Sequence, residues 1–417
     1  MQPFVIPPEP LRVALIGAGQ RSRTVYAPLF PALEPWVKVV AVCDPVRQHA
    51  DALAERLGAP AFYSIHGLVK ARPMEAALVV TPVPSHHSIS IYLSSHGIHN
   101  LAETTWCSLI AQAKDMITTA ERNKVVVRVG ENFFRFPIDR MAQGLKASKF
   151  IGEIRRVFSY NDHTGYHNNS RWIAFAGAHP TSIQSVEHTM TTAEFWSTPE
   201  RFHTDETYRG RFITFPDGLM VIDQASNIKG FLGRHSRPGY NEWQGERGTL
   251  VYATIPGKGW EGAAEVRYCS DQALAAFGGQ HDQAFQIVSE NEDGKWKRIY
   301  VDLPTGHLEY ANPFDAPGDP GHSNRAWYGI PVAEHVVDFA LATRGLRKSE
   351  FGPQDAMMSL MMEIGAHESA LHDGKRIALP LEGEPEADRL SRENLRKQFG
   401  ADPMDVEGML AISYPKP

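Results

Sequence analysis

The chain has 417 residues, which is enough for two domains that each bury a sizeable core. Its hydrophobic content of 42%, charged content of 22% and formal net charge of −6 are typical of a soluble globular protein and argue against nucleic acid as a partner. Residues 1–12 hold four prolines and no long apolar run, so we expect neither a signal peptide nor a membrane span, and a cytoplasmic protein.

The cysteines are Cys43, Cys107 and Cys269. They are far apart and form no C-x-x-C pattern. This spacing argues against a disulfide framework and a zinc knuckle, and predicts small core residues.

From residue 11 to about residue 130, apolar runs alternate with segments of helical period, which predicts a doubly wound parallel sheet of the Rossmann type. The expected strands cover residues 12–16, 37–43, 76–80, 100–102 and 125–129. The expected helices cover residues 23–33, 47–57, 88–95 and 109–123.

Beyond Gly130, short alternating strands at residues 153–160, 208–215 and 219–225 predict an α+β domain with a mainly antiparallel open sheet. Helices are expected at residues 332–343 and 353–372, with Gly345 and Gly374 as their stops. We therefore predict a dinucleotide-binding domain (1–130), a substrate-binding domain (131–381) and an extended or partly helical tail (382–417).

The first expected strand runs into Gly17-Ala18-Gly19-Gln20-Arg21-Ser22, a G-x-G-x-x-G fingerprint with Ser22 in place of the third glycine. The first two glycines permit a tight turn and close approach of a pyrophosphate. Asp44 lies 25 residues after Gly19, close to the position of an acid that accepts hydrogen bonds from the adenosine ribose. The acid favours NAD over NADP, although Arg47 nearby weakens that preference.

Three further segments accompany this turn: Val79 to His86, Gly97 to Thr105, and Gly130-Glu131-Asn132 followed by Arg135-Phe136-Pro137. Together they resemble the Gfo/Idh/MocA family, named for glucose-fructose oxidoreductase and inositol dehydrogenase, over roughly residues 11–380. The resemblance implies NAD as cofactor, and it implies that the following residues line the dinucleotide site: Gly17, Gly19, Gln20, Arg21, Ser22, Asp44, Arg47, Thr81, Pro82, His86, Glu103 and Asn132.

The catalytic segment departs from the family pattern. Family members usually carry Glu-Lys-Pro where this chain has Glu103-Thr104-Thr105, and Thr104 cannot act as a base without an activating neighbour. The resemblance also implies a helix that begins roughly Asp-x-x-x-His. We assign that histidine to His179 rather than His188, because spacing to the Asp217-Gly218 turn favours it; nine helical residues would put the two histidines on opposite faces.

Residues 161–172 form a predicted polar loop with aromatic side chains that could hold a polyhydroxylated ligand. Its candidate substrate-binding residues are His163, Tyr166, His167, Arg171 and Trp172. We expect no metal, although His163, His167, His179 and Glu187 are plausible ligands. Residues 234–237 and 321–325 are further polar loops that could reach a cleft.

The favoured function is NAD-dependent oxidation of a hydroxyl of a sugar, glycoside or cyclitol, with His179 as base and Thr104 in the lysine position. A redox-neutral NAD-dependent glycosidase or lyase, and a non-catalytic NAD or sugar sensor, are the alternatives. By analogy with the family we also expect a homodimer or homotetramer.

Overall fold

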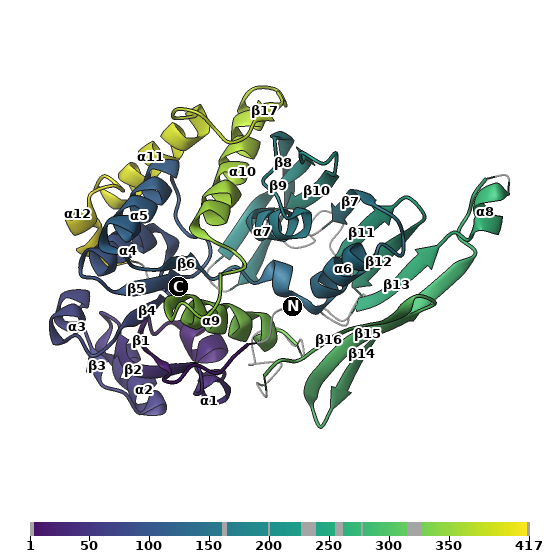
Figure 1. Cartoon of the computed structure of the whole chain (residues 1–417). Coiled ribbons are helices and arrows are strands. Elements are labelled where there is room, and N and C mark those ends of the chain that lie inside the picture. The colour runs from purple at the N-terminus through teal and green to yellow at the C-terminus, as the bar shows by residue number, and fades with distance from the viewer. Residues whose placement is uncertain are drawn as a thin grey trace.

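The computed structural model describes residues 4–160, 165–198, 201–226, 239–254, 262–276, 278–314 and 327–414. Within them lie two sheets, and helix α9 (Gly329–Thr343) lies between them in the view of Figure 1. Buried apolar side chains from both sheets and the helices between them form one hydrophobic core.

The N-terminal sheet is parallel, with the order β3-β2-β1-β4-β5-β6, and confirms the predicted doubly wound architecture. Its strands are β1 (Leu11–Ile16), β2 (Val37–Cys43), β3 (Ala61–Phe62), β4 (Ala76–Val79), β5 (His99–Ala102) and β6 (Val127–Val129). Its helical segments are η1 (Ser22–Tyr26), α1 (Phe30–Leu33), α2 (Arg47–Leu57), α3 (Ile65–Ala71), η2 (Val83–Ser85), α4 (His86–Ser95) and α5 (Ile110–Asn123).

Two details of this sheet differ from the prediction. The continuous helix expected at residues 23–33 is wrong: the structure has η1 and α1 as separate turns. Pro28, between them, has no backbone N–H and cannot continue a helical ladder. The short strand β3 was not predicted, because two residues are too few to show a period.

The second sheet is mixed but mostly antiparallel, with the order β16-β15-β14-β13-β12-β11-β7-β10-β9-β8-β17. Only the β7–β10 pair is parallel among the described strand pairs of this sheet. Its strands are β7 (Ile154–Tyr160), β8 (Ser182–Thr198), β9 (Arg201–Thr214), β10 (Met220–Ser226), β11 (Tyr240–Gly245), β12 (Gly248–Thr254), β13 (Gly262–Tyr268), β14 (Gln283–Glu292), β15 (Lys295–Leu303), β16 (Gly306–Ala311) and β17 (Ile377–Ala378). Strands β14 to β16 extend away from the body at the lower right of Figure 1.

Helices α6 (Pro137–Ser148), α7 (Gly165–Ala176) and α10 (Pro353–Leu371) contact this sheet. The predicted loop at residues 161–172 is therefore wrong from Gly165 onward, because α7 begins there. The helix buries a continuous run of polar and apolar side chains, and the interior hydrogen bonds that these polar groups make could not be read from composition.

The last part of the chain returns to the N-terminal sheet. Helix α11 (Glu386–Phe399) packs on α10, and α12 (Val406–Leu410) packs on α4 and η2. The Gln112 amide donates to the Pro403 carbonyl at 2.9 Å, which ties this segment to α5. The remaining described helices are η3 (Phe133–Arg135) and α8 (Asp271–Ala275).

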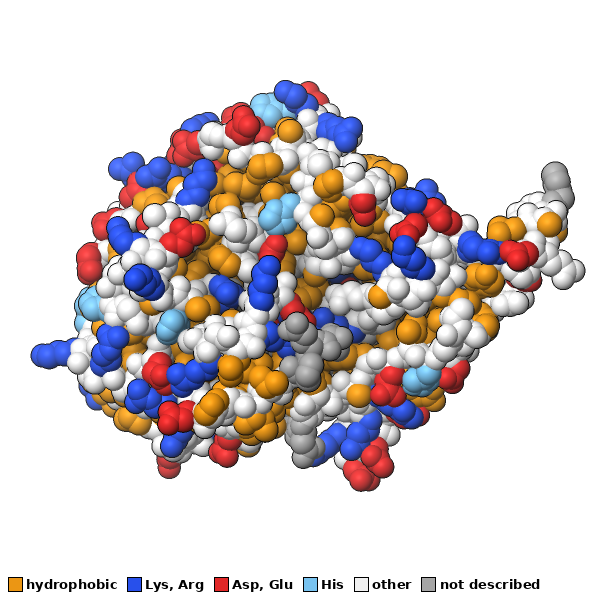
Figure 2. All heavy atoms as spheres, viewed as in Figure 1, with side chains coloured by type: hydrophobic (Ala, Val, Ile, Leu, Met, Phe, Trp, Pro, Cys, Tyr) orange, Lys and Arg blue, Asp and Glu red, His pale blue; other side chains and the backbone are white. Residues whose placement is uncertain are grey.

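The surface in Figure 2 intersperses positive and negative side chains and forms no large patch of one sign. None of the described helices is both long and apolar enough to span a membrane. The three cysteines are buried and unpaired, as predicted.

Candidate functional site

The glycine turn after β1 has the geometry that a dinucleotide fingerprint requires. Gly17 has φ +94°, and a Cβ there would lie 2.1 Å from the Val80 carbonyl oxygen, so no other residue fits. A Cβ on Gly19 would meet nothing within 4 Å, which leaves open space beside the turn. The Ser22 hydroxyl donates to the Gly17 carbonyl at 2.6 Å, and this buried bond closes the turn in which a third glycine is absent.

Asp44 follows β2 and faces the glycine turn. One carboxylate oxygen accepts from the Ala18 amide at 2.7 Å and the other from the Val46 amide at 2.8 Å. The Arg47 guanidinium stacks over the Tyr63 ring at 3.8 Å. The structure therefore brings the predicted acid and Arg47 to the same edge of the sheet as the glycines.

Glu103 follows β5 and forms the centre of a buried polar cluster. It accepts from Arg21 Nε at 2.7 Å and Tyr26 Oη at 2.8 Å on one oxygen, and from the Thr104 amide (3.0 Å) and hydroxyl (3.3 Å) on the other. Burial opposes its ionisation, but the Arg21 charge, the nearby His335 and the hydrogen bonds from Arg21 and Tyr26 together outweigh burial and lower the pKa of Glu103 to about 2. The His335 imidazole contacts Tyr26 Oη at 3.1 Å, and burial lowers the pKa of His335 to about 3. The Thr104 hydroxyl thus donates a hydrogen bond to the Glu103 carboxylate. Because the pKa of Glu103 is so low, this carboxylate cannot remove the hydroxyl proton and make Thr104 a base at neutral pH.

His86 joins two of the strand ends that the cofactor would meet. Its ring nitrogens lie 2.8 Å from the Thr81 carbonyl oxygen and 2.9 Å from the Thr105 carbonyl oxygen. The side chain is fully buried, and burial lowers its pKa. His86 therefore fixes the loops after β4 and β5 relative to each other.

The end of β6 brings Glu131 and Asn132 beside the Glu103 turn, because the Gly130 amide donates to the Ala102 carbonyl at 2.8 Å. Both side chains are buried. Only Asn132 was assigned a role from the sequence, although Glu131 stands in the same motif.

His167 lies in the first turn of α7 and faces the end of β6. Its ring stacks on Phe133, with centroids 4.6 Å apart and an interplanar angle of 16°, and its Nδ1 lies 3.5 Å from Glu131 Oε2. The neighbouring Tyr166 hydroxyl accepts from the Trp106 amide at 3.3 Å, which ties the start of α7 to the loop after β5. The ends of β5 and β6 and the start of α7 therefore meet around a histidine whose side chain is 22% exposed.

His167 fits the expected helix start better than His179 does. It sits at the beginning of a helix, four residues after His163, and that helix ends at Gly177 with φ +71°. The four-residue interval is present in the sequence. It was not recognised because position 163 holds a histidine instead of an acid, and because the polar composition of the segment suggested a loop. His163 lies outside the described residues.

His179 lies after α7, not in its first turn. Its Nε2 is 2.8 Å from Asp355 Oδ1, and its side chain is 39% exposed. The residues that line the pocket beside it come from the segment 180–181, α10 and the chain after β17. None of these lining residues belongs to the predicted dinucleotide set. His188 is on strand β8 and exposed, so the comparison of helix faces between the two histidines is wrong.

Arg171 and Trp172 are core residues of α7. The Arg171 guanidinium pairs with Asp139 at 2.7 Å, and the fully buried Trp172 indole donates to Asp223 at 2.8 Å. Neither ring nor guanidinium is free to contact a sugar in this arrangement. Residues 234–237 and 321–325 lie outside the described ranges. Within those ranges no group of three or more metal-ligating side chains comes together.

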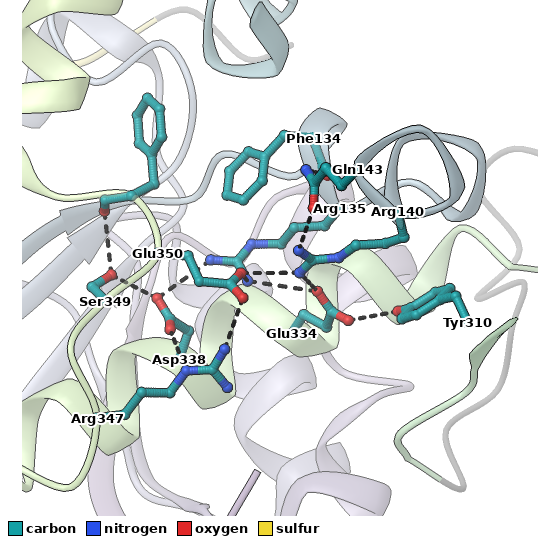
Figure 3. A network of polar contacts seen from close by, with 11 residues as sticks. Phe134, Arg135, Arg140, Gln143, Tyr310, Glu334, Asp338, Arg347, Ser349 and Glu350 are labelled. Carbon is teal, nitrogen blue, oxygen red and sulfur yellow. Dashed lines mark hydrogen bonds and ion pairs between the residues drawn. The ribbon is translucent and has the colours of Figure 1, made fainter. Parts of the chain in front are cut away.

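An arginine–carboxylate cluster, which the sequence did not reveal, lies beside Phe134 (Figure 3). Its members are Arg135, Arg140, Arg347, Glu334, Asp338 and Glu350. These side chains come from η3, α6, α9 and the segment that joins α9 to α10. The cluster therefore attaches η3, and with it Phe133, to the helix between the two sheets.

Comparisons with known proteins agree with this geometry. Residues 11–131 match the Gfo/Idh/MocA model, described as an oxidoreductase family with an NAD-binding Rossmann fold. A D-glucoside 3-dehydrogenase of Escherichia coli (strain K12) is 32% identical over 114 residues, which are 27% of this chain and 32% of that relative. The chain thus matches about a third of the curated relative's length.

Solved structures extend the likeness in fold to the second sheet. The WlbA dehydrogenase from Bordetella pertussis, in complex with NADH and UDP-GlcNAcA, has a TM-score of 0.63 at 16% identity, over 91% of this chain and all of that one. A levoglucosan dehydrogenase in complex with NADH and levoglucosan has a TM-score of 0.62 at 16% identity, over 89% and 100%.

A parallel sheet with the glycine turn, joined to a large mostly antiparallel sheet, defines an NAD-binding oxidoreductase fold. Over residues 11–131 the chain is similar to the Gfo/Idh/MocA oxidoreductase family.

Proposed function

We propose that this chain is an NAD-dependent dehydrogenase that oxidises one hydroxyl of a sugar, glycoside or cyclitol. The NAD-binding domain supports the cofactor, and a relative named D-glucoside 3-dehydrogenase supports the substrate class. On this proposal residues 1–130 bind the nucleotide and residues 131–381 bind the substrate.

The observation that carries the proposal is the position of His167. Its imidazole lies where the ends of β5 and β6 meet the start of α7, and its Nε2 forms no hydrogen bond with any described residue. A neutral imidazole can accept a hydroxyl proton near neutral pH, which Thr104 cannot do. His167 therefore replaces His179 as the proposed base.

The residues around the glycine turn fit NAD. The open space beside Gly19 suits a pyrophosphate, and Asp44 stands at the edge where a ribose would lie. Bound NAD+ would supply the hydride acceptor. The chain itself would orient the carbinol, exclude water with the buried residues around Glu131, and hold the released proton on His167 Nε2.

The test begins with NAD+ binding measured by calorimetry. A panel of glucosides, levoglucosan and myo-inositol then follows, monitored by absorbance of the reduced nicotinamide and by mass spectrometry of products. His167→Ala should lower kcat by about 10²- to 10⁴-fold, the range that general base catalysis contributes, without weakening NAD+ binding. His179→Ala is the matched control and should keep kcat within about threefold, because that histidine lies outside the proposed site.

Loss of activity in His179→Ala but not in His167→Ala would mean that His179 is the base, as the sequence analysis predicted. Glycoside cleavage without net NADH would favour a redox-neutral enzyme. NAD+ binding without turnover of any member of the panel would favour a sensor.

A further inference from the structure

We propose that Glu131 is a positioning residue that fixes the tautomer and the orientation of the His167 imidazole. In this arrangement Nδ1 carries the proton and Nε2 presents its lone pair to the substrate hydroxyl. The inference rests on the proposed function for its chemistry, but its geometry can be tested without substrate.

The first argument is the placement of the Glu131 carboxylate. Its side chain is 0% exposed, at the end of β6. Oε2 accepts from the Ser170 hydroxyl at 2.9 Å and lies 3.5 Å from His167 Nδ1. Both contacts come from α7, so the carboxylate is directed at the start of that helix.

The second argument is that each of these two side chains has a buried polar atom that forms no hydrogen bond. Glu131 Oε1 and His167 Nδ1 form no hydrogen bond with any described residue. A buried polar atom left unpaired is costly, so folded proteins rarely keep one on each of two contacting side chains for structural reasons alone. Catalytic hydrogen bonds are often long before ligand binds and shorten in the complex. The 3.5 Å separation is consistent with a pair that closes when His167 takes a proton.

The third argument is chemical. A carboxylate can only accept hydrogen bonds, so an imidazole nitrogen that faces it must carry the proton. The stacked Phe133 ring holds the plane of the His167 ring. With Nδ1 directed at Glu131, Nε2 is the nitrogen left to act as base. A carboxylate orients the imidazole in the same way in serine hydrolases.

The pair also supplies the carboxylate that the family pattern would lead one to expect beside this histidine. The chain has Thr104 in place of a lysine, and a histidine at position 163 in place of an acid. Glu131 supplies a carboxylate to the same imidazole from another element, the end of β6.

The chain provides a matched control. His179 and Asp355 also form a histidine–carboxylate pair, at 2.8 Å, but their side chains are 39% and 31% exposed. The other Asp355 oxygen accepts from the Gly352 amide at 2.8 Å, so that carboxylate has a partner on each oxygen and serves the start of α10.

The experiment measures histidine tautomers by ¹⁵N NMR of the full-length protein without NAD or substrate, with the His167 signals assigned from their loss in His167→Gln. In the wild type, neutral His167 should be the Nδ1–H tautomer. Glu131→Gln should convert a large fraction to the Nε2–H tautomer, whereas Glu131→Asp should retain Nδ1–H. Asp355→Asn should leave the His167 signals unchanged.

Kinetics with a substrate found in the panel form the second readout. Glu131→Gln should lower kcat by about 10- to 100-fold, as loss of a carboxylate behind a functional histidine does, with KM for NAD+ within about twofold of the wild type. Glu131→Asp should recover part of kcat. Asp355→Asn should change neither constant.

An Nε2–H tautomer of His167 in the wild-type protein overturns the proposal even if no Glu131 variant folds. An unchanged tautomer or unchanged kcat in folded Glu131→Gln also overturns it. A tautomer change in a protein that oxidises nothing would support the positioning role of Glu131 and refute the proposed dehydrogenase function.

Discussion

Removing the Glu334 charge should destabilise the fold strongly. Its side chain is 0% exposed; it contacts Arg140 and Arg135, and accepts from the Tyr310 hydroxyl at 2.5 Å. Among the described residues the arginine–carboxylate cluster balances three guanidiniums with three carboxylates, so Glu334→Gln leaves the cluster with one buried positive charge in excess and Arg140 with Glu350 as its remaining partner. Breaking one member of a buried ion pair costs about 3–5 kcal/mol.

The assay is thermal unfolding followed by circular dichroism. With an unfolding entropy of about 2.1 cal/mol/K per residue, that cost corresponds to a Tm lower by roughly 4–10 °C, depending on whether the whole chain or one part of it unfolds as a unit. Glu393→Gln is the control, because its pair with Arg389 is about half exposed on both sides and is worth at most about 0.5 kcal/mol. A Tm for Glu334→Gln within 1–2 °C of the wild type, on the order of the control, would refute the view that the cluster is desolvated and interdependent.

Two further predictions concern the glycine turn and acid stability. Gly17→Ala should lower the Tm of the NAD-free protein, because the added Cβ would lie 2.1 Å from a carbonyl oxygen. Gly19→Ala should leave that Tm unchanged but weaken NAD+ binding by about tenfold or more. Equal losses of Tm in the two variants would contradict this distinction. Burial opposes ionisation of Glu350, but Arg135 and Arg140 outweigh it and lower its pKa to about 2. Its stabilising contribution should be present above about pH 4.5 and disappear as pH falls toward 2. The Tm difference between wild type and Glu350→Gln should therefore stay constant from about pH 7 to about pH 4.5 and shrink between about pH 4.5 and 2.

The N-terminal sheet could be predicted because its signals are local. Each buried strand is a short apolar run, and the glycine turn places its conformational requirement on Gly17 itself. Many strands of the second sheet were missed because their alternating residues are only partly buried. In β14, for example, most side chains are intermediate or exposed, so the apolar period is weak.

The catalytic end depends on contacts that sequence spacing does not contain. Arg171 and Trp172 looked like ligand-binding residues, but Asp139 and Asp223 on other elements bury and satisfy them. His179 was chosen by distance along the chain. The structure shows instead that the helix begins earlier, which places His167 at its start.

Helix α9 links the two ends of the site. Through Asp338 it holds Arg135 at the end of η3, whose first residue stacks on His167. One turn away, its His335 contacts Tyr26, which donates to Glu103 beside the dinucleotide edge. A hydrophobic helix of the same shape could be equally stable, because buried ion pairs gain little net free energy over apolar packing. Guanidinium–carboxylate contacts, however, are directional and accept few geometries. We infer that α9 sets the distance between the proposed base and the cofactor edge, and that its charges specify this register more than apolar side chains in the same positions would.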